Sequence, residues 1–269
     1  MFALPLYDDN PTQRAAIVTW MVVGLCIAIF LWQQSLPARL GHAAALSFGM
    51  VPAVIFGTAH LPRELAVVPP WASLFTSMFL HGGWLHIAGN MLFLWIFGDN
   101  VEDAMGSLKF VVFYLTCGVV AALTQALAAP NSVVPMVGAS GAIAGVLGAY
   151  LLLHPWANVR VLVVILIFIR LIDVPALIVL GLWFLGQVIS AETTPASVGG
   201  VAFWAHIGGF LCGLLLLPIF KRRGVSLFGA RRTRAFAVSG ARVVRRGRIP
   251  TVIPHAPRDP WRGRRNPWH

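Results

Sequence analysis

Charged residues are scarce in this 269-residue chain: Asp, Glu, Lys and Arg together make up 11%, whereas 58% of the residues are hydrophobic and the mean hydropathy is +0.79. A soluble domain of this size cannot bury so much apolar surface. Several apolar runs approach or exceed the roughly 18 to 20 residues that span a bilayer. The composition therefore indicates an integral, multi-pass membrane protein.

Acidic residues are few, and basic residues gather near one end of the chain. Residues 221–269 hold fourteen Lys or Arg and one acid, Asp259, so this segment carries +13, whereas the rest of the chain carries −2. A basic segment after the last apolar run is typical of the cytoplasmic side of a membrane and of contact with anionic lipids. We do not expect nucleic-acid binding, because no folded recognition motif accompanies the arginines.

Cysteine is also rare. Cys26, Cys117 and Cys212 all lie inside apolar runs, which favours small buried side chains over a disulfide framework or a metal site. No cleavable signal peptide is evident, because the first apolar run starts late and is long enough to span a bilayer.

The apolar pattern predicts an all-α membrane protein with six transmembrane helices. We expect these helices at residues 15–33, 84–98, 107–128, 139–153, 174–190 and 202–220, within a membrane domain covering residues 15–220. Residues 1–14 read as a short cytoplasmic N-terminal segment and residues 221–269 as a basic, disordered cytoplasmic tail. Six crossings place both termini on the same side of the membrane.

The connections between these helices differ in character. Residues 34–80 contain five prolines, so they predict a long, partly helical first outer loop with short helices in the membrane interface. The acidic sequence GDNVEDAMG after the second helix reads as a turn. Residues 161–172 are expected to be interfacial or half-buried.

Four polar side chains stand out in or beside the apolar helices, where such groups are costly and usually functional. They are His86, Asn90, Ser140 and His206, and the predicted topology places all four near the outer face. His86 and Asn90 are four residues apart and share one helix face. Two G-x-x-x-G pairs, Gly141 with Gly145 and Gly209 with Gly213, follow Ser140 and His206 and would let their helices approach closely.

These residue types suit nucleophilic catalysis. A serine hydroxyl needs a base to accept its proton, and a neutral imidazole has the right basicity near pH 7. The resulting oxyanion needs donors, which the backbone at the start of the Ser140 helix, the Asn90 amide and the His86 imidazole could supply. No Asp or Glu lies near His206 in the sequence, so we expect a Ser-His dyad.

Other readings of the same residues remain open. Ser140 could bond back to its own helix, and Asn90 could serve only as interhelical glue. A metal site of His81, His86 and His206 is disfavoured, because residues 81 and 86 would diverge by about 140° on one helix and no acid or cysteine completes the set. A transporter would need paired midplane charges or a repeated half, and neither is evident.

The chain resembles the rhomboid family of intramembrane serine proteases over roughly residues 70–218. The resemblance is carried by HGGWLHIAGN, GASGAIAG and AHIGGFLCG, with support from GDNVEDAMG and FYLTCG. It implies Ser140 as nucleophile, His206 as general base, His86 and Asn90 at the oxyanion, and a structural role for His81 in the outer loop. No metal or other cofactor is expected.

The resemblance also implies a rhomboid-like six-helix bundle that cleaves peptide bonds in or near the transmembrane segments of substrate proteins. The expected location is the bacterial inner (plasma) membrane, with both termini cytoplasmic. The alternative is a catalytically silent rhomboid-like protein that binds membrane proteins, although such a protein would normally lack the serine or the histidine. The chain departs from the family pattern at two positions. Ala72 follows Trp71 in the first outer loop, where some members have an arginine after the tryptophan. Ala144 stands where some members have a tyrosine that stacks on the catalytic histidine, which leaves open what orients His206.

Overall fold

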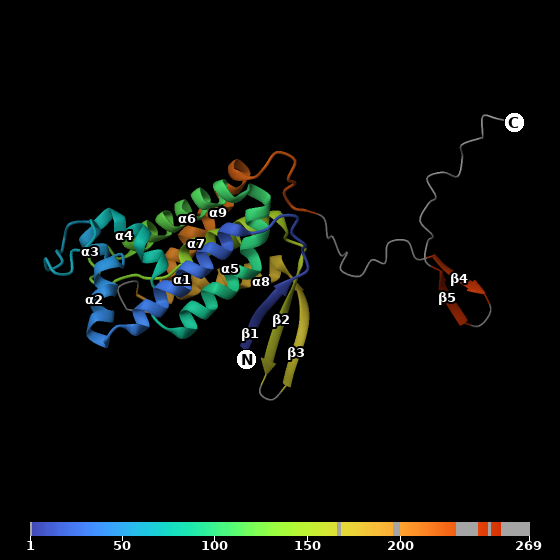
Figure 1. Ribbon diagram of the computed structural model, residues 1–269, viewed down its shortest axis with the longest axis horizontal. Helices are drawn as coiled ribbons and strands as arrows, with labels where there is room; N and C mark the ends of the chain where they lie inside the picture. Colours follow the sequence, from blue (N-terminus) through green and yellow to red (C-terminus); the bar gives the residue numbers. More distant parts are fainter. Residues whose placement is uncertain (1, 166–167, 196–199, 230–241, 247–248, 254–269) are drawn as a thin grey trace, which may run out of the picture. The chain divides into compact units, whose positions relative to one another are not determined.

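The computed structural model describes residues 2–165, 168–195, 200–229, 242–246 and 249–253. The chain forms two compact units, residues 1–232 and 233–269. The first unit is mostly helical (Figure 1). Its bundle consists of α1 (Ile17–Ser35), α5 (Trp84–Met105), α6 (Ser107–Ala128), α7 (Ser140–Leu153), α8 (Ala176–Thr193) and α9 (Phe203–Phe220).

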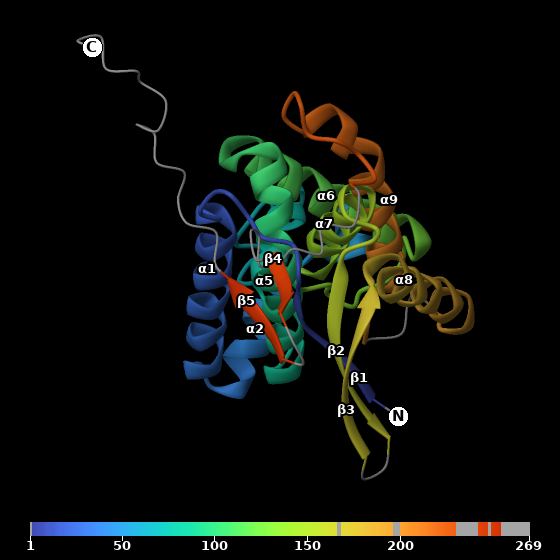
Figure 2. The ribbon, with the colours of Figure 1, turned by 90° about the vertical axis from the view of Figure 1, so that its right-hand side faces the viewer.

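Among the described residues, four helices are long and apolar enough to cross a membrane: α1, α6, α8 and α9. The central helix α7 has only 14 residues, about 21 Å of helix. Figure 2 shows α7 inside the bundle, with α1 and α8 on opposite sides. Because protein surrounds α7, with every residue from Gly141 to Tyr150 buried, this helix has little contact with lipid.

Glycines allow α7 and α9 to pack backbone to backbone. A Cβ at Gly209 would overlap the carbonyl oxygen of Gly141, and a Cβ at Gly213 would overlap the carbonyl oxygen of Gly145. On its other side, a Cβ at Gly141 would lie 2.6 Å from the Cβ of Ala121 on α6. The four glycines singled out in the sequence therefore lie at the helix contacts that bring the first turns of α7 and α9 together.

The acidic sequence after the second predicted helix is helical, so the prediction of a turn is wrong there. Helix α5 continues to Met105, because the acidic side chain of the buried Glu102 finds hydrogen-bond partners inside the protein. Its carboxylate accepts hydrogen bonds from the backbone N–H groups of Val18 (3.0 Å) and Thr19 (2.8 Å), and from the Ser107 hydroxyl (2.6 Å). Glu102 thus caps the start of α1 from another helix.

Residues between α1 and α5 form four short helical pieces: α2 (Ala38–Phe48), α3 (Pro52–Ile55), α4 (Pro70–Thr76) and η1 (Ser77–Phe79). They lie at the end of the bundle where α7 begins (Figure 1). A β-bridge between Met50 and Met136 joins this segment to the chain leading into α7.

The all-α prediction is wrong at the opposite end of the bundle, where three antiparallel strands form a sheet in the order β1-β2-β3. These are β1 (Phe2–Asp8), β2 (Asn158–Ile165) and β3 (Phe168–Pro175). The register pairs Phe2 with Val164 and Asn158 with Pro175. The N-terminal segment is therefore a strand, and the stretch predicted to be interfacial or half-buried contains most of a β-hairpin.

The sequence of this hairpin explains its conformation. It is rich in Val and Ile, whose branched side chains fit a pleated strand better than a helix. Arg160 and Asp173 face each other across β2 and β3 and form a salt bridge of 2.7 Å. This contact raises the pKa of Arg160 and lowers that of Asp173. Pro175 then ends the hairpin and begins α8.

The second unit contains the antiparallel strands β4 (Arg242–Arg246) and β5 (Ile249–Ile253), where the sequence predicted a disordered tail. The start of that tail belongs to the first unit: Arg222 forms a salt bridge of 3.0 Å with Asp103 on α5. Residues 230–241, 247–248 and 254–269, which carry several of the tail's arginines, lie outside the described residues.

Candidate active site

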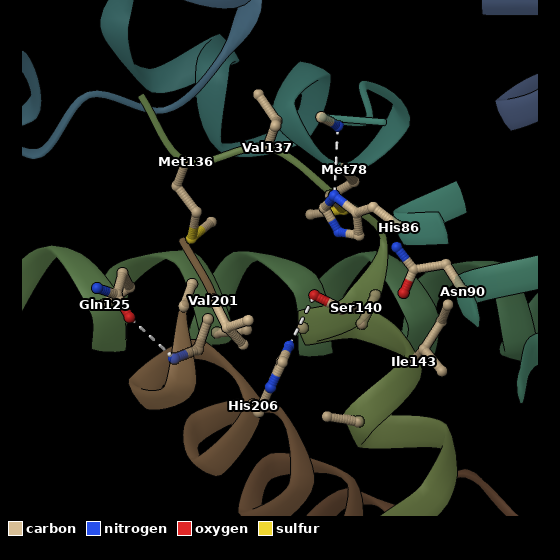
Figure 3. A pocket seen from close by; sticks show the side chains of 18 of the residues that line it. Met78, His86, Asn90, Gln125, Met136, Val137, Ser140, Ile143, Val201 and His206 are labelled. Atoms are coloured by element: carbon tan, nitrogen blue, oxygen red, sulfur yellow. Dashed lines mark hydrogen bonds between the residues drawn. The ribbon is translucent and has the colours of Figure 1, made fainter. Parts of the chain in front are cut away.

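Ser140 and His206 meet although they are 66 residues apart. Ser140 is the first residue of α7, and His206 lies in the first turn of α9. The distance between Ser140 Oγ and His206 Nε2 is 2.8 Å, a normal hydrogen bond (Figure 3). The close α7–α9 packing makes this approach possible, because no side chain separates the two backbones at the glycine contacts.

His86, on the first turn of α5, lies beside this pair. Its Nδ1 accepts a hydrogen bond of 3.3 Å from the backbone N–H of Gly82. In a neutral ring the proton therefore sits on Nε2. That nitrogen approaches Gly138, where an added Cβ would lie 2.7 Å from it. Gly138 has φ +128°, so both its conformation and its contact with His86 require glycine.

Asn90 follows His86 by about one helical turn and points the same way (Figure 3). Its side chain is 7% exposed, and within the described part of the chain its Nδ2 has no hydrogen-bond partner. A Cβ at Gly138 would lie 3.7 Å from this nitrogen. The His86 and Asn90 donors thus converge on the backbone two residues before Ser140, at the N-terminus of α7, where helix N–H groups also lack intrahelical acceptors.

A cavity of about 960 Å³ contains these groups. Ser140, His206, His86 and Asn90 all line it, and most of the remaining lining comes from apolar residues of α5, α6, α7 and the segment leading into α7. The cavity is large enough for water and for several residues of an extended peptide.

His81 does not line this cavity, but it supports a residue that does. It is 2% exposed, and its ring meets the His86 ring edge-on at a centroid distance of 5.2 Å. The Gln33 amide on α1 holds the His81 backbone, accepting its N–H at 3.0 Å and donating to its carbonyl at 3.4 Å. Burial lowers the pKa of His81 to about 4, so this imidazole is neutral near pH 7.

The structure adds a partner of His206 that the sequence reasoning missed. Gln187 on α8 places its Oε1 2.7 Å from His206 Nδ1. Trp183, one turn earlier, lies against the same imidazole with a centroid distance of 5.7 Å. A glutamine inside an apolar helix is a signal of the same kind that singled out Asn90, and it could have identified Gln187.

The sequence profile of the rhomboid domain matches residues 69–223, more than half of the chain. The chain belongs to the rhomboid family. The matched region runs from just before α4 to just after α9 and so includes Ser140, His206, His86, Asn90, His81 and Gln187.

Named relatives come from bacteria and from plant and fungal organelles. This rhomboid is 34% identical to the rhomboid protease GluP of Bacillus subtilis (strain 168) over 188 residues, 69% of this chain and 34% of GluP. It is 30% identical to Rhomboid-like protein 11, chloroplastic, of Arabidopsis thaliana over 164 residues, 57% of this chain and 54% of that protein. It is 33% identical to Rhomboid protein 1, mitochondrial, of Saccharomyces cerevisiae (strain ATCC 204508 / S288c) over 150 residues, 53% of this chain and 40% of that protein. The matches therefore span about a third to a half of these relatives.

Proposed function

We propose that this rhomboid is an intramembrane serine endopeptidase that cleaves transmembrane segments of other proteins through a Ser140–His206 dyad. The observation that carries the proposal is the 2.8 Å contact between Ser140 Oγ and His206 Nε2. The match to a family that includes a named protease, GluP, supports it.

In the first step His206 Nε2 takes the proton of the Ser140 hydroxyl while Oγ attacks the carbonyl carbon of the substrate peptide. The negative charge that develops on the carbonyl oxygen is stabilised by His86 Nε2–H, Asn90 Nδ2–H and N–H groups at the start of α7. The imidazolium of His206 then protonates the leaving amine, and the C–N bond breaks.

In the second step a water molecule from the cavity loses a proton to His206 and attacks the acyl-serine. Collapse of the second tetrahedral intermediate releases the new carboxyl end and returns the proton to Ser140. A substrate helix must unwind to enter this reaction, because an intact helix hides its carbonyl groups in i to i−4 hydrogen bonds.

The orientation in the membrane is part of the same proposal. Six crossings by the bundle helices would place both termini in the cytoplasm of a bacterial cell, where the basic segment after α9 can contact anionic lipids. The first turns of α5, α7 and α9 would then open toward the outer face, where water reaches the cavity.

The direct test is cleavage of a single-pass membrane reporter by the purified protein in liposomes. The wild type is expected to yield two fragments and to react with a fluorophosphonate probe. Ser140→Ala should do neither, and His206→Ala should yield no fragments. Ser35→Ala, which changes an exposed serine on α1, serves as the matched control and should behave as the wild type.

Two outcomes contradict the proposal. Fragments that persist in Ser140→Ala would show a contaminating protease or another nucleophile. A wild type that binds the reporter without cutting it, under conditions where the probe also fails to react, would favour the catalytically silent alternative.

A further inference from the structure

His206 lacks the usual groups that hold a catalytic imidazole. The ring has no carboxylate partner among the described residues. Ala144 stands at the position where some members of the family have a tyrosine that stacks on the histidine. Its hydrogen-bond partners are instead Ser140 at Nε2 and Gln187 at Nδ1. The ring is 8% exposed, so a poorly oriented imidazole would find little water to replace these contacts.

The amide of Gln187 determines which nitrogen of His206 carries the proton. An amide oxygen only accepts, so its contact of 2.7 Å requires a hydrogen on Nδ1. In the neutral ring Nε2 then has a free lone pair, and this nitrogen faces Ser140 Oγ. This is the tautomer that a general base needs.

Contacts within α8 support this assignment of the amide. The nitrogen end of the Gln187 side chain donates to the backbone carbonyl of Trp183 at 3.5 Å, one turn earlier on the same helix. That bond directs the oxygen end toward His206. The Trp183 ring lies against the imidazole at an angle of 36°, which restricts its rotation.

Aromatic packing between α8 and α9 brings the amide to the imidazole. Phe184 stacks on Phe210 of α9 with a centroid distance of 4.4 Å, and Trp183 also contacts Phe210 at 6.2 Å. The buried residues of α8 are only Ala176, Leu180 and Ala191, so these aromatic contacts form much of the local attachment beside the site.

We infer that Gln187 is the positioning residue of the dyad, holding His206 in its Nδ1–H tautomer so that Nε2 accepts the proton of Ser140. The inference rests on the proposed protease function. Gln187 does not line the cavity, and its amide contacts His206 rather than Ser140. Its neutral amide fixes the tautomer and orientation of the imidazole, as the third carboxylate does in a Ser-His-Asp triad, but without the negative charge of that carboxylate.

The test compares Gln187→Met and Gln187→Glu in the cleavage assay. Methionine keeps the length of the side chain but removes the strong acceptor, so kcat should fall about 10- to 100-fold while KM changes little. Gln34→Met makes the same substitution at an exposed site on α1 and should have no effect.

Gln187→Glu should restore the acceptor and most of the lost activity. Its carboxylate also stabilises the imidazolium, so the acidic limb of the pH–kcat/KM profile should move to higher pH. Among the residues that the structure describes, the other titratable group whose charge reaches His206 is His86 on α5; Ser140 and Trp183, which also face the ring, stay neutral over this range. A purely structural residue would not shift this limb.

A second measurement does not depend on activity. Nitrogen-15 NMR of histidine-labelled protein, with the His206 signals assigned from a His206→Asn sample, should show the Nδ1–H tautomer in the wild type and a mixture of tautomers in Gln187→Met. Wild-type kcat and one unchanged tautomer in Gln187→Met would overturn the inference. Equal losses in the Met and Glu variants, with unshifted pH profiles, would also overturn it. A wild type that is inactive while its tautomer depends on Gln187 would contradict only the proposed function.

Discussion

At the scale of single residues, Asn90 illustrates a conflict between stability and function. A buried amide nitrogen without a partner among the described residues carries a desolvation cost, so it calls for an explanation. The position of this nitrogen beside Gly138 suits a charge that develops only during the reaction. A residue that only joined helices would gain nothing from this unpaired donor.

We therefore expect Asn90→Val to separate the two properties. The variant should lose roughly 100-fold in kcat, because one oxyanion donor is gone, while its melting temperature stays the same or rises. Reporter cleavage and thermal unfolding in detergent would measure both. A lower melting temperature with unchanged kcat would instead show that Asn90 only stabilises the packing between helices.

At the scale of helices, most of the framework was predictable. All six apolar runs form helices, because an apolar stretch of this length has few other ways to satisfy its backbone in a bilayer. The predicted ends of the helices were less accurate. Helix α5 continues seven residues beyond the predicted 98, to Met105, since its acidic residues find partners that sequence alone does not reveal. Glu102, for example, reaches the start of α1, more than eighty residues away.

The sheet and the Gln187 contact were missed for a related reason. Short apolar runs such as residues 158–165 fit a buried helix or a strand equally well, and the partner strand that decides, β1, lies about 150 residues earlier in the sequence. Gln187 meets His206 only through the packing of α8 on α9. The Ser140–His206 pair was easier to predict, because the glycine spacing on both helices indicated that the two helices pack closely.

The α7–α9 contact yields a prediction for Gly213→Ala. The new methyl group would overlap the Gly145 carbonyl oxygen, so the helices must separate at a cost of about 1–3 kcal/mol. Separation also moves His206 away from Ser140, and cleavage should fall more than stability explains. Gly24→Ala, on the open face of α1 with nothing within 4 Å of the new Cβ, should be neutral in both assays. An active, fully stable Gly213→Ala would show that this contact is not tight.

The cap of α1 yields a second prediction at this scale. In Glu102→Gln one carboxylate oxygen becomes an NH₂ group, which cannot accept the N–H groups of Val18 or Thr19. We expect the free energy of unfolding to fall by about 1–3 kcal/mol. Glu64→Gln removes an equal charge from an exposed site and should leave stability unchanged. Chemical denaturation of both variants in micelles would measure the difference, and equal stabilities would refute the capping role.

At the scale of the whole molecule, one carboxylate joins three distant parts of the first unit. Asp8 at the end of β1 accepts a hydrogen bond from the Tyr150 hydroxyl on α7 and another from Asn100 Nδ2 on α5, at 3.2 Å. Strand β1 also pairs with β2, so residues 2–8 are fixed to the connection between α7 and α8. Burial raises the pKa of Asp8 from 3.8 to about 7.

The raised pKa of Asp8 predicts how stability depends on pH. Between about pH 4 and 7 the folded protein keeps a proton on Asp8 that the unfolded chain has released, so the free energy of unfolding falls as pH rises, by up to roughly 4 kcal/mol over this window. Hydrogen-exchange protection of the β1 amides, relative to the intrinsic exchange rate at each pH, would reveal the loss. Asp8→Asn should abolish this dependence, whereas Asp173→Asn, which removes an exposed carboxylate from the same sheet, should keep it.

Cleavage measured at fixed pH should be unchanged in both variants, since Asp8 meets α7 ten residues, about 15 Å, from Ser140. Greater protection of β1 at pH 7 than at pH 5 in the wild type would reverse the predicted sign and show that Asp8 is stabilised as the ionised form.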